Sequence, residues 1–188
     1  MNLPNKLTIF RVILIPFFVL FLLLEPDNQT FRLIADLIFI VASLTDMLDG
    51  KIARKQGLIT DFGKFMDPLA DKILVTSALI CFVDLWVTPA AVIIVIIARE
   101  FIVTSLRLIA APKGIVIAAD IFGKMKTVSQ MIWVATTILQ MYLEEELWIG
   151  VTALAALNTL LMWATLALTV ISGINYLWKN RAVLSDMK

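Results

Sequence analysis

The chain contains no histidine and a single cysteine, and both scarcities restrict the chemistry available to it. Without an imidazole there can be neither a histidine base nor a histidine metal ligand. Cys81 lies in an apolar run, which excludes a thiolate metal cluster and an intrachain disulfide. A small buried side chain is its expected role, because a cysteine nucleophile would have no histidine partner. Any catalysis must therefore depend on carboxylates, lysines, arginines, hydroxyls or bound metals.

Glycine and proline are also scarce, at seven and six of 188 residues, whereas 61% of the residues are hydrophobic. An apolar fraction this high indicates a membrane protein, and about 20 apolar residues suffice for one spanning helix. We expect an all-α integral membrane bundle of six transmembrane helices, forming a single domain over residues 1–188. The expected spans are 7–24, 31–48, 69–86, 89–111, 128–143 and 147–178. The first is interpreted as a retained span, because no small-residue cleavage site follows it.

The sign of the charge alternates between the segments that connect these spans. Segments 25–30, 84–88 and 143–147 contain acidic residues and no lysine or arginine. Segments 49–66 and 112–127 and both tails instead contain several lysines and arginines. Because basic loops stay in the cytoplasm, this pattern predicts a multi-pass protein of a bacterial cytoplasmic membrane with both termini cytoplasmic.

Four aspartates stand at the facing ends of two apolar runs. Asp46 and Asp49 close the second run, and Asp67 and Asp71 open the third. Separations of three and four residues put each pair on one helix face. A short connecting loop would make the two helices antiparallel neighbours, so that four carboxylates converge and repel one another unless cations bind. Divalent ions with oxygen ligands, above all Mg²⁺, resolve that repulsion, although carboxylates that only cap helix ends are an alternative.

The aspartates belong to a longer pattern of eight fixed residues over 26 positions. The pattern reads Asp46-x2-Asp49-Gly50-x2-Ala53-Arg54-x8-Gly63-x3-Asp67-x3-Asp71. It resembles the signature of the CDP-alcohol phosphatidyltransferases, with every fixed position filled and the spacing kept. The resemblance implies the six-helix fold of that family, with an active site that faces the cytoplasm.

The same resemblance implies a role for each residue of the pattern. Asp46, Asp49 and Asp67 would ligate two metal ions, Mg²⁺ or Mn²⁺, and Asp71 would complete the site and act as the catalytic general base. The residues expected to hold CDP-diacylglycerol are Asn5, Thr8, Asp49, Gly50, Arg54 and Gly63. The alternatives are turn or packing roles for the two glycines and a helix cap for Asn5 and Thr8. We expect the loop between the two helices to contain Gly57 and Gly63.

Three outer motifs resemble the members of this family that use sn-glycerol 3-phosphate as the acceptor. They are Asn5-Lys6-Leu7-Thr8 with Arg11, the stretch Ala98-Arg99-Glu100-Phe101 through Arg107, and Gly123-Lys124-Met125-Lys126-Thr127. The resemblance implies transfer of a phosphatidyl group from CDP-diacylglycerol to that acceptor, in phospholipid biosynthesis. The acceptor phosphate needs a basic pocket, for which the candidates are Arg107, Lys124 and Lys126, followed by Arg11 and Arg99.

Other interpretations remain open at this point. Lys124 and Lys126 could be membrane-surface anchors. Arg99 and Glu100 are adjacent and should point in different directions, so each could pair with a partner on another helix. The acceptor could be inositol phosphate, serine or phosphatidylglycerol, and the aspartates could instead form a cation transporter. The expected partners are membrane lipids and, by the resemblance, a second copy in a homodimer; no nucleic-acid partner is expected.

Overall fold

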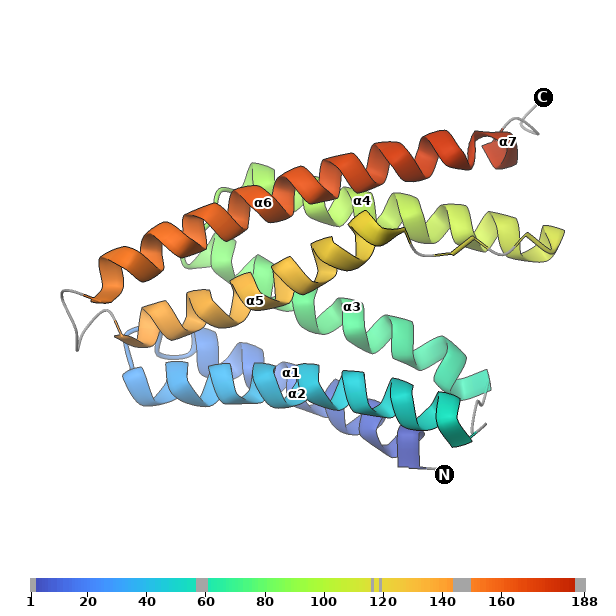
Figure 1. Ribbon diagram of the computed structural model, residues 1–188. Helices are drawn as coiled ribbons and strands as arrows, with labels where there is room; N and C mark the ends of the chain where they lie inside the picture. Colours follow the sequence, from blue (N-terminus) through green and yellow to red (C-terminus); the bar gives the residue numbers. More distant parts are fainter. Residues whose placement is uncertain (1–2, 57–60, 116, 119, 144–149, 185–188) are drawn as a thin grey trace. The chain divides into compact units, whose positions relative to one another are not determined.

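The computed structural model describes the backbone of residues 3–56, 61–115, 117–118, 120–143 and 150–184, and this part of the chain is entirely helical or irregular (Figure 1). Within it, the side chains of residues 46–56, 61–65, 67–68 and 71 and a few others are outside the description. The helices are α1 (Leu3–Leu23), α2 (Gln29–Gln56), α3 (Asp61–Asp84), α4 (Ala90–Ala110), η1 (Ala111–Lys113), α5 (Ile121–Leu143), α6 (Gly150–Lys179) and α7 (Arg181–Leu184). Each of the six predicted spans coincides with one of the long helices, which confirms the all-α class.

The helices α2 and α3 are longer than the predicted spans. The segment 49–66 was expected to be a loop, but α2 continues to Gln56 and α3 begins at Asp61. Lysine, arginine, alanine and glutamine are good helix formers, so the helix continues after the sequence has become too polar for lipid. The expected loop position of Gly63 is therefore wrong: Gly63 lies within α3, and Gly57 is outside the described residues.

The first compact unit comprises residues 1–87 and 134–155. In it, α1 packs against both α2 and α3. The buried face of α1 includes Phe18 and Leu22, and the Phe18 ring lies 5.8 Å from that of Phe39 in α2. Arg32 of α2 donates a hydrogen bond to the backbone carbonyl of Met141 in α5. The helix α1 is thus part of the packed unit.

The second compact unit comprises residues 88–133 and 156–188. Its apolar core joins α4, α6 and α7 and is formed by Val103, Leu106, Ala110, Tyr176 and Val183. Elsewhere in the unit α6 buries polar residues at helical spacing, namely Thr165, Thr169 and Ser172. The same helix exposes large apolar residues, among them Leu160, Trp163, Val170 and Ile174. A helix that is polar inside and apolar outside is suited to lipid, where interhelical hydrogen bonds contribute about 0.6–2 kcal/mol each.

Two of the described helices contain segments long and apolar enough to cross a membrane, Asn5–Leu23 in α1 and Thr152–Lys179 in α6. Only 28% and 17% of their residues are buried, whereas the core helix of a soluble protein is mostly buried. The other long helices include charged residues in or beside their apolar runs, such as Arg99, Glu100 and Arg107 in α4. The six-span topology and its orientation therefore stay predictions.

Candidate active site

The two aspartate pairs of the signature lie in adjoining helices of the first unit. Asp46 and Asp49 belong to α2, Asp67 and Asp71 belong to α3, and each pair shares a face by helical periodicity. Asp49 stands seven residues before the end of α2, and Asp67 stands six residues after the start of α3. At 1.5 Å per residue Asp49 lies about 10.5 Å before the end of α2, and Asp67 lies about 9 Å after the start of α3. Each pair is thus two to three turns from its helix end, while the four side chains lie outside the described residues.

A polar stripe on α1 lies in the same unit as these pairs. Asn5, Thr8 and Arg11 follow one another at intervals of three residues, and all three side chains are buried. Farther along the same face the buried residues become apolar, beginning with Ile15. Asn5 and Thr8 lie within α1 instead of preceding it, so a role as N-cap is wrong. The interior of this unit is therefore polar at the N-terminal end of α1.

The donor set of the signature suits hard divalent ions. Four carboxylates supply oxygen ligands only, and Mg²⁺ in proteins is usually bound through one or two carboxylates together with substrate phosphates. Among the residues whose side chains are described, no group of three acidic, cysteine or histidine residues could hold a metal. The metal role of Asp46, Asp49, Asp67 and Asp71 stays a prediction, as do the roles of Gly50, Arg54 and Gly63.

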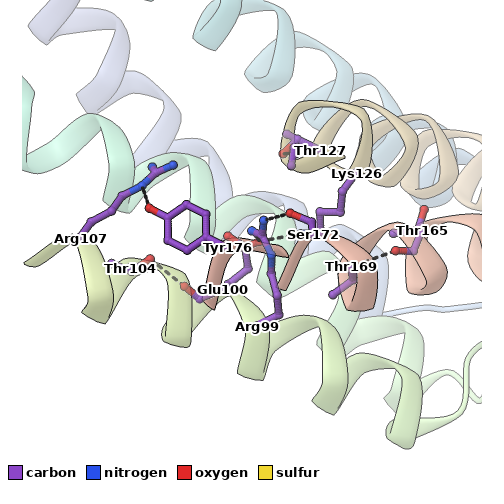
Figure 2. Close-up of polar contacts among 11 residues, drawn as sticks. Arg99, Glu100, Thr104, Arg107, Lys126, Thr127, Thr165, Thr169, Ser172 and Tyr176 are labelled. Carbon is purple, nitrogen blue, oxygen red and sulfur yellow. Dashed lines mark hydrogen bonds and ion pairs between the residues drawn. The ribbon is translucent and has the colours of Figure 1, made fainter. Parts of the chain in front are cut away.

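The second unit contains a charged cluster shared by α4, α5 and α6 (Figure 2). Oε1 of Glu100 accepts hydrogen bonds from Lys126 Nζ and from Arg99 Nη1, both at 2.8 Å. Nη2 of Arg99 also donates to the Ser172 hydroxyl of α6. Lys126 has a side chain that is only 3% exposed, so its interpretation as a membrane-surface anchor is wrong. The predicted pairing of Glu100 across helices is confirmed, whereas the expectation that Arg99 and Glu100 point apart is wrong.

This cluster of Arg99, Glu100 and Lys126 brings two cations to one carboxylate. In addition, Nε of Arg99 is buried and has no hydrogen-bond partner among the described residues. A buried donor without a partner costs about 1–3 kcal/mol. The Nε–H group of Arg99 is therefore a donor that an anion could satisfy, and the role of Arg99 as a ligand stays a prediction.

Arg107 and Lys124 are more accessible than Lys126. Arg107 donates from Nε to the Tyr176 hydroxyl at 2.8 Å, and its guanidinium carbon lies 5.6 Å from the centre of the Tyr176 ring. Lys124 is exposed near the start of α5. Beside Tyr176 a cavity of about 360 Å³ is lined by Ile117, Ala118, Asp120, Ile121, Lys179 and Asn180. The structure thus places Arg99 and Lys126 together, with Arg107 and Lys124 elsewhere in the same unit.

Sequence reasoning missed the residues that orient these cations. The Ser172 hydroxyl accepts a hydrogen bond from Arg99, and the Tyr176 hydroxyl accepts one from Arg107. The available signal was the recurrence of polar residues every three or four positions in the apolar run of α6. Asp36 of α2 was also missed, although it is an acid within an apolar run; it is buried, and its Oδ1 has no hydrogen-bond partner in the described chain.

Comparison with known proteins adds to this geometry. Residues 1–171 match the CDP-alcohol phosphatidyltransferase family. Three relatives bear the name CDP-diacylglycerol–glycerol-3-phosphate 3-phosphatidyltransferase. The one from Bacillus subtilis (strain 168) is 43% identical and covers 95% of both chains, and the one from Escherichia coli (strain K12) is 40% identical and covers 98% of both. The one from Haemophilus influenzae is 46% identical over 70% of this chain and 72% of its own. The family inferred from the aspartate signature is confirmed, and the chain belongs to the CDP-alcohol phosphatidyltransferase family.

Proposed function

We propose that the chain transfers a phosphatidyl group from CDP-diacylglycerol to sn-glycerol 3-phosphate, forming phosphatidylglycerol phosphate and CMP. The observation that carries this proposal is the similarity to relatives named for this reaction, which extends over nearly the whole length of two of them. Membership of the family argues against the cation transporter, because the aspartate signature is accounted for by phosphatidyl transfer. The alternative acceptors stay open to direct test.

The donor half of the site would be built on α1, α2 and α3. Asp46, Asp49, Asp67 and Asp71 would hold two Mg²⁺ ions, which when bound neutralise charge on the pyrophosphate of the donor. The nucleotide end would lie against Gly50, Arg54 and Gly63, together with Asp49. Asn5 and Thr8 would contribute from the polar stripe of α1, which belongs to the same compact unit. This assignment puts a charged nucleotide beside the polar end of that unit.

The chemical step would be an attack by the acceptor hydroxyl on the phosphorus that carries diacylglycerol. Asp71 would take the proton of that hydroxyl, since the chain has no histidine to act as base. The new P–O bond joins the phosphatidyl group to glycerol 3-phosphate, and the bond to CMP breaks. CMP leaves with the electron pair of that bond.

The acceptor phosphate would bind the basic residues of the second unit. Arg99 and Lys126 would supply two cations, and the buried Nε of Arg99 provides a donor that a phosphate oxygen can satisfy. Arg107 and Lys124 would add charge from more accessible positions. Arg11, which is fully buried in α1, is a further candidate for the acceptor phosphate.

The location of the reaction follows from its substrates. One substrate is a lipid and the other is soluble, so a site at the cytoplasmic surface of a bacterial membrane can reach both. We propose six spans with both termini in the cytoplasm, on the basis of the alternating loop charges. A homodimer, embedded among membrane lipids, is proposed from the family alone.

The decisive experiment is CMP release by purified protein in detergent. We expect release with CDP-diacylglycerol only when Mg²⁺ and sn-glycerol 3-phosphate are both present, and loss of release on chelation with EDTA. Inositol phosphate, serine and phosphatidylglycerol serve as the competing acceptors. Release with one of these and not with glycerol 3-phosphate would overturn the acceptor assignment while leaving the family intact. Release that does not respond to EDTA would contradict the metal site.

Replacement of Arg107 by alanine tests the acceptor pocket. We expect Arg107→Ala to raise the KM for glycerol 3-phosphate about tenfold or more, because a hydrogen bond to a charged group contributes about 1.5–3 kcal/mol. The KM for CDP-diacylglycerol should stay within about twofold, a change of less than 1 kcal/mol. Arg181→Ala is a matched control, since Arg181 is likewise stacked on an aromatic ring, at 5.3 Å from Trp178, and has no assigned role. Equal KM values for Arg107→Ala and wild type would remove Arg107 from the pocket.

A further inference from the structure

Two glycines border the side chain of Arg99. Gly123 lies at the start of α5, and Gly173 lies in α6. A Cβ atom added at Gly123 would approach Nη2 of Arg99 to 3.1 Å and the Ser172 hydroxyl to 3.4 Å. A Cβ atom added at Gly173 would approach Cγ of Arg99 to 3.2 Å. Because Gly123 and Gly173 have no Cβ atom, they leave room for the two ends of the Arg99 side chain.

The use of glycine at these positions needs a reason. Glycine is the poorest helix former after proline, so alanine would favour both helices. Neither glycine has a positive φ, since Gly114 is the only glycine with one among the described residues. Backbone conformation therefore does not require glycine at 123 or 173, and the space taken by Arg99 is the remaining explanation.

The position of Arg99 is also determined by hydrogen bonds. The Nη1 atom donates to Glu100, and Nη2 donates to Ser172 of α6. Figure 2 shows the Arg99 side chain between these two acceptors. With both ends of the guanidinium held, the buried Nε is the donor left without a partner in the described chain. A small displacement of Cγ or of Nη2 would therefore redirect Nε.

We propose that Gly123 and Gly173 are positioning residues that form a slot for Arg99 and thereby aim its free Nε at the phosphate of the acceptor. The inference rests on the proposed function, since it assumes that glycerol 3-phosphate is the acceptor. Gly173 sets the path of the aliphatic part of Arg99, and Gly123 sets the place of the guanidinium. Neither glycine touches the substrate.

The test compares Gly123→Ala and Gly173→Ala with wild type by CMP release in detergent. We expect each to raise the KM for glycerol 3-phosphate about ten- to a hundredfold, the loss that corresponds to one charge-assisted hydrogen bond. The KM for CDP-diacylglycerol and the thermal unfolding temperature should hardly change. Ala167→Val, on the exposed face of α6, adds bulk without meeting Arg99 and should behave as wild type. An unchanged acceptor KM in both glycine variants would overturn the slot.

A double-mutant cycle separates positioning from general damage to the helix. If Gly173 acts through Arg99, then adding Gly173→Ala to Arg99→Ala should raise the acceptor KM no further. Additive effects of the two changes would overturn the inference. The wild-type assay separates failure of the proposed function from failure of the slot. If wild type uses a different acceptor, the proposed function is wrong. If wild type uses glycerol 3-phosphate and the glycine variants have the same KM for it, the slot alone is wrong.

Discussion

The Asp71→Asn variant is expected to release CMP at least about 100-fold and up to about 10,000-fold more slowly than wild type, the range for loss of a general base. Asparagine has the shape of aspartate but cannot accept the proton of the acceptor hydroxyl. It also removes a negative charge from the proposed metal site, so the observed loss should lie toward the upper end of the range. The measurement is turnover of purified protein at saturating CDP-diacylglycerol, glycerol 3-phosphate and Mg²⁺.

Asp84→Asn is the matched control for this variant. Asp84 is the last residue of the same helix, α3, and its side chain is exposed. It has no assigned role, so its replacement should leave turnover unchanged. The thermal unfolding temperature of both variants should stay near that of wild type, which separates chemistry from folding. Full activity of Asp71→Asn would refute the assignment of Asp71 as the base.

The Glu100→Gln variant is expected to lower the free energy of unfolding by about 3–5 kcal/mol, the usual effect of removing one partner of a buried ion pair. Glu100 is bonded to both Arg99 and Lys126, and the amide cannot balance their charges. Lys126 is almost completely buried and would have no access to water as compensation. Thermal unfolding in detergent should show a fall of roughly 10 °C for a chain of this size.

Two further variants identify the cause of that fall. Glu100→Gln combined with Lys126→Met removes one buried cation together with its counter-charge, so most of the lost stability should return. Asp27→Asn tests an exposed ion pair, since Asp27 lies 3.4 Å from Arg32 and its side chain is 98% exposed. Solvent screens such a pair, and we expect no measurable change. An unfolding temperature of Glu100→Gln equal to that of wild type would contradict a stabilising role for the cluster.

The number and order of the helices could be predicted from the sequence because lipid imposes a simple requirement. A spanning segment must be apolar and must satisfy its own backbone hydrogen bonds, so each long apolar run is a helix. The ends of the helices could not be predicted in the same way. Hydropathy reports where a helix leaves lipid, whereas α2 ends where its backbone hydrogen bonds end, at Gln56.

The aspartate signature was likewise accessible from the sequence. Its spacing follows helical periodicity, and the family that it indicated is confirmed by the comparisons. The surroundings of the basic residues were predicted less well. Lys126 was treated as an accessible cation, and only the fold shows that it is buried against Glu100. Arg99 and Glu100 were expected to point apart because adjacent positions in a helix differ by about 100°. Long side chains overcome that angle when a third residue, Lys126, shares the same carboxylate.

The sequence by itself therefore determined the all-α class, the six long helices, the family and the residue types available for catalysis. Each of these depends on local pattern, namely apolar run length, helical spacing and the absence of histidine. Only the tertiary structure decided which side chains accept hydrogen bonds from Arg99, Arg107 and Lys126. It also decided that Gly123 and Gly173 border Arg99. Those contacts join α4, α5 and α6, and the residues that they bring together lie up to 74 positions apart, from Arg99 to Gly173. No local pattern specifies which side chain of a distant helix enters the space beside a glycine, because that depends on how the helices pack.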